Sequence, residues 1–173
     1  SIVRTNPDGY NLRSSVWLKA IGEDYLDSAL VYAHRADPEA KLFINEYGAE
    51  MQGKAKAEAY FNLAKRLKAS GIPLDGVGLQ CHFTVGELDS VKFDSNIRRF
   101  SELGINCNIT ELDMSMPDLS DYNCYRLQAR EYRKITNTLL RYSHAPHLIV
   151  WGITDEQSWR QGEPLLFNSN VEK

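Results

Sequence analysis

The sequence has little of several features that would assign it to a specialised class of proteins. Its 20 Lys and Arg residues are slightly outnumbered by 23 Asp and Glu residues, so it lacks the basic excess of a nucleic-acid-binding surface. No run of about 20 apolar residues is present, which predicts no membrane-spanning helix. The three cysteines, Cys81, Cys107 and Cys124, form no CxxC pair and no complete set of disulfides. The first residues do not have the pattern of a signal peptide.

The residues that are present indicate a folded α/β protein. The composition is 43% apolar and 25% charged, which is typical of a globular domain. Four short apolar runs predict strands, at 41–47, 76–83, 106–116 and 147–153. Helical patterns alternate with these runs, so we predict a parallel sheet with crossover helices. The runs are nearly continuous in apolar residues, which is typical of strands covered on both faces.

The predicted helices have clear start and stop signals. We expect a loop over Ser1–Arg13 with a turn at Asn6-Pro7-Asp8-Gly9. Helices are then predicted from Ser14 or Ser15 to about Ala36, over Lys54–Ser70, from a cap at Asp94-Ser95 to Leu103, and from a cap at Asp121 to about Tyr142.

Polar side chains gather at the carboxyl end of each predicted strand. Within the first three strand ends the residues are two positions apart, a spacing that places both on one face of a strand. Carboxyl ends of parallel strands meet at one rim, where active sites of α/β folds lie. The residues are Asn45 and Tyr47, Gln80 and His82, Glu111 and Asp113, and Asp155 with Trp151 and Trp159 near it.

These residue types suit a sugar-cleaving site. A carboxylate beside an imidazole and a second carboxylate stays ionised and oriented, as a nucleophile requires. Aromatic rings pack against the apolar face of a pyranose, and amides bond its hydroxyl groups. A metal site made by His82, Glu111 and Asp113 is an open alternative, although one histidine and two acids make a thin ligand set.

The motifs resemble glycoside hydrolase family 10, the endo-β-1,4-xylanases. Segment 109–113, Ile-Thr-Glu-Leu-Asp, is similar to the family's nucleophile strand, and 76–82 is similar to its Gly-Val-Gly-x-Gln-x-His strand. Further matching segments are 12–17, 21–25, 151–155, 158–160 and 164–167. The resemblance implies a retaining enzyme on an eight-stranded TIM-type (β/α) barrel without a cofactor or metal. It implies that Glu111 is the nucleophile, that His82 bonds Glu111, and that Asp113 orients His82.

The resemblance also implies a xylan-binding surface. Gln80 would contact the sugar next to the nucleophile, and Trp151 and Trp159 would wall the site. Asn45 and Tyr47 would line the aglycone side, which holds the leaving part of the substrate. Xylan or xylo-oligosaccharide is the expected ligand, and export to an extracellular or periplasmic location is expected because xylan lies outside the cell.

The chain departs from the family pattern in two ways. Glu46 and Gly48 stand where the family usually has Asp and often Asn. The family's first four strands, with its acid/base glutamate, would precede Ser1, and its last helix would follow Lys173. We therefore expect residues 1–173 to be the C-terminal half of the barrel, inactive until an N-terminal half or a second copy completes it. Glu46 and Asp155 are the other acids at the rim, and neither matches the family's acid/base.

Two other functions stay open at this stage. One is another retaining β-glycanase, a cellulase or a mixed-linkage glucanase, since the rim residues do not separate xylose from glucose. The other is a non-catalytic glycan-binding fragment, in which the tryptophans bind sugar while Glu111 has no acid partner. A metabolic α/β enzyme would require a phosphate-binding glycine loop, and the sequence has none.

Overall fold

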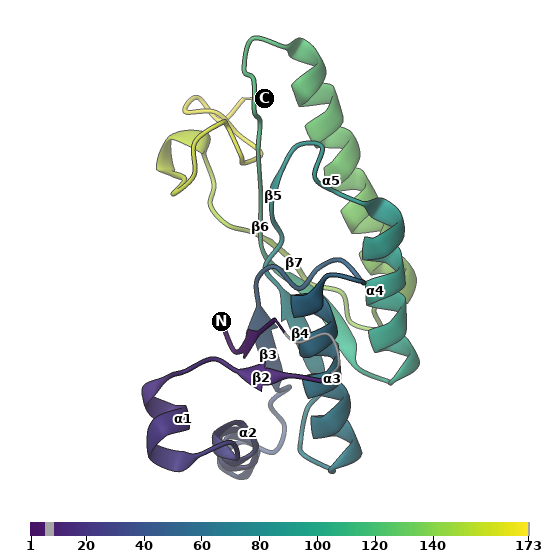
Figure 1. The fold of residues 1–173 in the computed structure, drawn as a ribbon. Helices are drawn as coiled ribbons and strands as arrows, with labels where there is room; N and C mark the ends of the chain where they lie inside the picture. The colour runs from purple at the N-terminus through teal and green to yellow at the C-terminus, as the bar shows by residue number, and fades with distance from the viewer. Residues whose placement is uncertain (6–8, 173) are drawn as a thin grey trace.

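A parallel sheet forms the centre of the molecule. The computed structural model describes residues 1–5 and 9–172 (Figure 1). In this part of the chain, β3 (Phe43–Glu46), β4 (Gly76–Leu79), β6 (Asn106–Ser115) and β7 (Leu148–Val150) lie side by side in that order, and each pair is parallel. β5 (His82–Thr84) follows β4 after a two-residue break and pairs in parallel with the end of β6. The predicted parallel sheet is confirmed.

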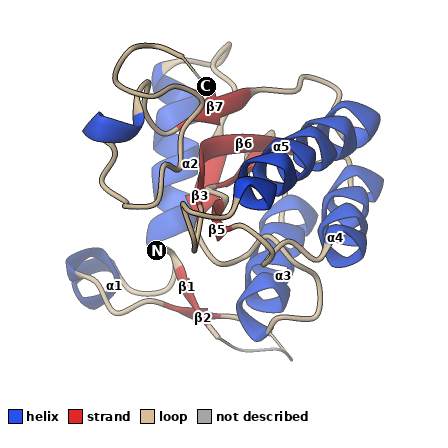
Figure 2. Ribbon diagram, turned by 90° about the horizontal axis from the view of Figure 1, so that it is seen from above, coloured by secondary structure: helices blue, strands red, loops and turns tan. Residues whose placement is uncertain are grey.

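Three helices connect the strands and cover one face of the sheet. They are α3 (Ala55–Ala69), α4 (Ser90–Glu102) and α5 (Tyr122–Tyr142), which lie on the same side of the strands in Figure 2. Their inward faces are apolar: Tyr60, Phe100 and Ile135 have no more than a trace of exposed surface. The Tyr60 ring meets the Phe100 ring edge-on at 6.1 Å, and its hydroxyl donates a 2.7 Å hydrogen bond to the Ile44 carbonyl. The predicted strand–helix alternation therefore builds the core.

The N-terminal region differs from the prediction in two places. Instead of a loop throughout, β1 (Val3–Arg4) and β2 (Asn11–Leu12) form a small antiparallel sheet. Residues 6–8 of the predicted turn lie outside the described residues. The predicted single helix is two helices, α1 (Val16–Ile21), capped by Ser15 as expected, and α2 (Tyr25–Ala36). Gly22 separates them because its φ of +98° is incompatible with a continuous helix.

Two predicted boundaries are also wrong. α4 begins at Ser90 and is capped by Asp89, whose carboxylate accepts from the N–H groups of Val91 and Lys92, so Asp94 and Ser95 lie inside the helix. The predicted strand 76–83 is broken at Cys81, whose φ of +63° lies in the left-handed region. Gln80 and His82 therefore flank a kink, and the two-residue spacing does not place them on one regular strand.

Both outer strands of the sheet have one partner in the described part of the chain. β3 pairs with β4 alone, and β7 pairs with β6 alone. Beside β3 lies an apolar groove of about 470 Å³, and on β7 Ile149 is 53% exposed. The groove is lined mainly by apolar side chains of α2 and β3, including Leu26, Ala29, Leu30, Ala33, Phe43 and Ile44.

Of the helices described, none has the length and apolar character needed to cross a membrane.

Candidate active site

Glu111 lies in β6 where the strand pairing is irregular. The register between β6 and β7 shifts between Ile109 and Leu112, so Glu111 falls outside a regular ladder. Its Oε1 accepts a 2.9 Å hydrogen bond from the side-chain amide of Asn45 on β3. The Asn45 oxygen in turn accepts a 2.8 Å bond from the Thr110 hydroxyl. Glu111 is thus held by a side chain from β3, on the far side of β4.

Gly78 leaves the space in which Asn45 and Thr110 meet. β4 lies between β3 and β6, and a Cβ atom at Gly78 would come within 2.6 Å of Asn45 Oδ1 and 2.8 Å of Thr110 Cγ2. Any larger residue would push the two side chains apart. Close packing across the sheet therefore requires this glycine of the Gly-Val-Gly motif.

His82 lies between the two carboxylates that the sequence placed near it. Its Nδ1 is 2.9 Å from Asp113 Oδ2, and its Nε2 is 3.3 Å from Glu111 Oε2. Burial alone would lower the pKa of His82, but the hydrogen bonds and negative charges of Asp113 and Glu111 outweigh it and raise the pKa. In its protonated form the ring donates to both acids and ties them together.

Asp113 is fully buried and is the most heavily bonded residue of the site. Besides His82, the Trp159 indole N–H donates to Oδ2 at 2.8 Å and the Arg160 guanidinium donates to Oδ1 at 2.9 Å. Burial would raise the pKa of Asp113, but these three donors lower it. The Trp159 ring also meets the His82 ring edge-on at 5.1 Å. Two residues of the loop after β7, Trp159 and Arg160, are therefore hydrogen-bonded to the cluster of Glu111, His82 and Asp113 through Asp113.

The remaining predicted residues lie at the strand ends without bonding the cluster directly. In the described chain, no hydrogen bond joins the side chains of Gln80, Tyr47 or Trp151 to Glu111. Gln80 donates its backbone N–H to the Glu46 carbonyl, and Trp151 donates its backbone N–H to the Leu112 carbonyl. The side chains of Trp151 and Tyr47 are about half exposed, at 46% and 49%.

The two other rim acids are engaged in structural bonds. Glu46 is fully buried, and its carboxylate accepts from the N–H groups of Ile2 and Val3 and lies 3.1 Å from the Lys56 ammonium. Burial would raise the pKa of Glu46, but these donors lower it, which is the opposite of what a general acid needs. Asp155 accepts a 2.7 Å bond from the Leu165 N–H.

Sequence reasoning missed four contacts of the cluster. Trp159 was expected to line the substrate site, and nothing in the spacing of its motif predicts that Trp159 and Arg160 both donate to Asp113. Asn45 was expected to contact substrate, whereas its amide bonds Glu111, and Thr110 was given no role. Each of these contacts joins residues more than 40 positions apart, so local patterns carry no signal for them.

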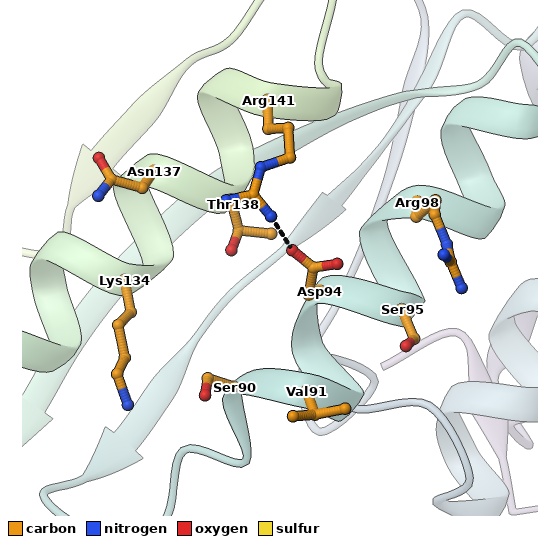
Figure 3. A pocket seen from close by; sticks show the side chains of 9 residues that line it. All are labelled: Ser90, Val91, Asp94, Ser95, Arg98, Lys134, Asn137, Thr138 and Arg141. Atoms are coloured by element: carbon orange, nitrogen blue, oxygen red, sulfur yellow. Dashed lines mark hydrogen bonds and ion pairs between the residues drawn. The ribbon is translucent and has the colours of Figure 1, made fainter.

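A cavity of about 520 Å³ elsewhere has a different character. It lies between α4 and α5, lined by Ser90, Val91, Asp94, Ser95, Arg98, Lys134, Asn137, Thr138 and Arg141 (Figure 3). The dashed line in Figure 3 is the 2.8 Å ion pair between Arg141 and Asp94, which joins the two helices. None of its lining residues belongs to the strand ends.

Over the described residues, no group of three His, Cys, Asp or Glu side chains is arranged to hold a metal ion.

The fold and the cluster define the class of the protein. A carboxylate–imidazole–carboxylate array at the carboxyl ends of parallel strands is a site of the kind found in (β/α) barrel enzymes. The sequence profile described as glycosyl hydrolase family 10 matches residues 2–173, and the chain belongs to this family.

Similar proteins agree with the family assignment. The chain is 37% identical over 169 residues to endo-1,4-beta-xylanase A of Thermoanaerobacterium saccharolyticum and 36% identical over 169 residues to exoglucanase XynX of Acetivibrio thermocellus. These matches cover 95% of this chain but 14% and 15% of the two relatives.

The crystal structure of TsXylA, an intracellular xylanase from Thermoanaerobacterium saccharolyticum, superimposes with a TM-score of 0.88 at 35% identity. Two point mutants of that xylanase were solved as complexes, one with xylotriose and one with xylotetraose. The superposition covers 99% of this chain and 52% of that one. The fold is therefore about half of a TIM-type barrel, as predicted.

Proposed function

We propose that this chain is the nucleophile-bearing half of a retaining endo-β-1,4-xylanase. The observation that carries the proposal is the array of Glu111, His82 and Asp113 at the strand ends. Glu111 attacks the anomeric carbon and displaces the leaving sugar, which forms a glycosyl–enzyme ester. Water then hydrolyses the ester with net retention of configuration.

The contacts of Glu111 suit a nucleophile. Its side chain is 15% exposed, so an oxygen can reach a substrate, while Oε1 and Oε2 are oriented by Asn45 and His82. Held in one rotamer, the carboxylate needs little reorganisation before attack. Asp113 fixes the His82 ring from the opposite side, and Arg160 and Trp159 fix Asp113. Asn45, Asp113 and His82 are positioning residues in this proposal.

The substrate surface is proposed from exposed aromatic rings around the cluster. Trp151 and Trp159 are 46% and 65% exposed, which leaves their rings free to pack against xylose units. Gln80 contacts the sugar beside Glu111, and Tyr47 contacts the sugar on the aglycone side. Point mutants of the similar solved xylanase were crystallised with xylotriose and with xylotetraose, and this supports a xylo-oligosaccharide as the ligand.

The general acid/base is proposed to come from an N-terminal half of the barrel. A retaining glycosidase needs a second carboxyl group about 5 Å from the nucleophile. Glu46 and Asp155 are committed to backbone N–H groups, which disfavours both as that acid. Residues 1–173 then form one partial domain, and the chain spans about half the length of the solved xylanases it matches.

The free edge of β3 is the proposed docking place for that N-terminal half. A parallel strand added there would satisfy the unpaired backbone of β3 and cover the apolar groove between α2 and β3. A second copy of this chain is the alternative occupant. It is less suitable because it would supply a second nucleophile and no acid/base.

The test is a reconstitution experiment. The mass of the purified chain is measured first, and the release of reducing sugar from xylan is then followed for the chain alone and with an N-terminal half from a family 10 relative. We expect activity in the mixture only. In the reconstituted enzyme, Glu111→Gln should lower kcat by at least about 1,000-fold. Hydrolysis by a single species of about 20 kDa would overturn the half-barrel proposal.

Two further points stay predictions. A cellulase, a mixed-linkage glucanase or a non-catalytic binder is less favoured because the similar solved structures are described as xylanases, although one curated relative is named an exoglucanase. Activity on carboxymethyl cellulose above that on xylan would reverse this preference.

Export was expected from the family resemblance, but the similar solved xylanase is described as intracellular, so family membership does not decide the compartment.

A further inference from the structure

Lys56 of α3 lies at the rim between a buried acid and an exposed aromatic ring. Its Nζ is 3.3 Å from the centroid of the Tyr47 ring and 3.1 Å from Glu46 Oε1. Only 15% of the Lys56 side chain is exposed, so the ammonium is largely withdrawn from water. A desolvated cation over an aromatic face is the strongest form of the cation–π interaction. Lys56 therefore holds the Tyr47 ring from one side.

Glu46 gives Lys56 a rigid anchor. The carboxylate is fully buried, and its Oε2 accepts from the N–H groups of Ile2 and Val3, which fixes it to β1. Its Oε1 accepts a 3.0 Å bond from the Tyr47 N–H as well as the Lys56 ammonium. The same carboxylate thus fixes both the backbone of Tyr47 and the cation above its ring.

Gly48, next to Tyr47 in the turn after β3, borders the Lys56 side chain. A Cβ atom at Gly48 would lie 3.6 Å from Lys56 Cδ, and the φ of +68° favours glycine there. That distance is an ordinary van der Waals contact, so the Lys56 side chain packs directly beside the turn that carries Tyr47 and Gly48.

We propose that Lys56 is a positioning residue for the aglycone side of the site. It fixes the Tyr47 ring so that the outward face receives the leaving xylose unit. This proposal rests on the proposed function, because Tyr47 has a sugar to contact only in a xylan-cleaving enzyme. The ring is 49% exposed, and Lys56 covers one face, so the other face is available to a sugar.

The test compares two substrates in the reconstituted enzyme. Xylotetraose places sugars on both sides of the cleaved bond, whereas β-xylobiosyl fluoride has a leaving group too small to reach Tyr47. For Lys56→Met we expect kcat/KM for xylotetraose to fall about tenfold, which corresponds to about 1.4 kcal/mol. The value for the fluoride should change by less than about twofold. Lys56→Arg keeps the cation and should restore most of the loss.

Three controls separate the outcomes. In a Tyr47→Ala background, Lys56→Met should cause little further change in kcat/KM for xylotetraose, because the ring that Lys56 positions is gone. If Lys56→Met lowers kcat/KM equally for both substrates, the role of Lys56 is structural and the proposal is wrong. An unchanged kcat/KM for both substrates also overturns the proposal. If the wild-type mixture cleaves neither substrate, the proposed function fails first. In the 173-residue chain itself, the aromatic NMR signals of Tyr47 should shift in Lys56→Met and not in the exposed control Lys41→Met.

Discussion

At the scale of single residues, the site works by mutual constraint of ionised groups. His82 is charged more easily because it lies between Asp113 and Glu111, and Asp113 stays ionised because His82, Trp159 and Arg160 donate to it. Each bond fixes an orientation as well as a protonation state. Glu111 is consequently aimed by side chains that come from other strands and from the C-terminal loop.

Replacing Asp113 tests this constraint directly. In Asp113→Asn the negative charge beside Nδ1 is lost while the burial of the ring remains, so the pKa of His82 should fall. The measurement is an NMR titration of the His82 Cε1–H signal in the 173-residue chain. Glu111→Gln is the matched comparison and should lower the same pKa by less, because Glu111 lies farther from the ring at 3.3 Å against 2.9 Å. An unchanged or higher pKa in Asp113→Asn would contradict the network.

At the scale of elements, the buried carboxylate of Glu46 joins β1 to β3. The strand β1 has only two residues and would have little stability of its own. Glu46 supplies acceptors for the N–H groups of Ile2 and Val3, and Lys56 neutralises its charge. The small N-terminal sheet is therefore tied to an acid that lies 43 and 44 residues farther along the chain than its two N–H donors.

This link should make stability depend on pH in the acid range. The pKa of Glu46 is lower in the folded state than in the unfolded chain, so its contribution is complete above the unfolded value of about 4.3 and is lost as the pH falls through the folded value. Glu46→Gln should lower the free energy of unfolding by about 2–4 kcal/mol at pH 7. Urea unfolding at pH 7 and pH 3 measures both effects.

The difference between wild type and Glu46→Gln should shrink at pH 3, where the acid is largely protonated in the unfolded chain. Glu102→Gln is the matched control. The Glu102 side chain is 67% exposed, and its ion pair with Arg98 is long, at 3.8 Å, so it contributes little to stability. It should change stability by no more than about 0.5 kcal/mol. An equal loss for both variants would show that the Glu46 bonds contribute little.

At the scale of the whole molecule, the sheet is open at both edges. β3 and β7 each have one partner in the described chain, and apolar side chains line the groove beside β3. An open edge with apolar surface beside it is an association surface in water. This arrangement, together with the half-length match to the solved xylanases, is why we expect activity to depend on a second half.

A bulky charge in the groove should block that association. Ala29 lines the groove and is exposed, so Ala29→Arg should leave the fold of the isolated chain intact but prevent the N-terminal half from docking. Tyr32→Arg is the control on the same helix, because Tyr32 is 66% exposed and does not line the groove. Xylanase activity against the concentration of added N-terminal half measures the effect. If both variants reach the same xylanase activity at the same concentration of N-terminal half, the docking surface lies elsewhere.

The sequence by itself determined the alternation of elements and the residue types at the strand ends. Apolar runs and turn residues act locally, so the alternation of strands and helices and the placement of Glu111, His82 and Asp113 at strand ends could be predicted. The break at Gly22 and the kink at Cys81 were missed, because both are backbone conformations with φ in the left-handed region. The boundary of α4 was misplaced because several nearby residues are suitable caps.

Beyond the contacts among Glu111, His82 and Asp113 that the family resemblance implied, only the tertiary structure decided which side chains meet. The bonds from Asn45 to Glu111, from Arg160 to Asp113 and from β1 to Glu46 join distant segments. The absence of a side chain at Gly78 lets Asn45 and Thr110 meet. Side-chain contacts of this kind depend on strand register and on the close approach of neighbouring strands. Local sequence patterns do not encode those distances, so the sequence predicts a reactive rim while the fold determines how its charges are held.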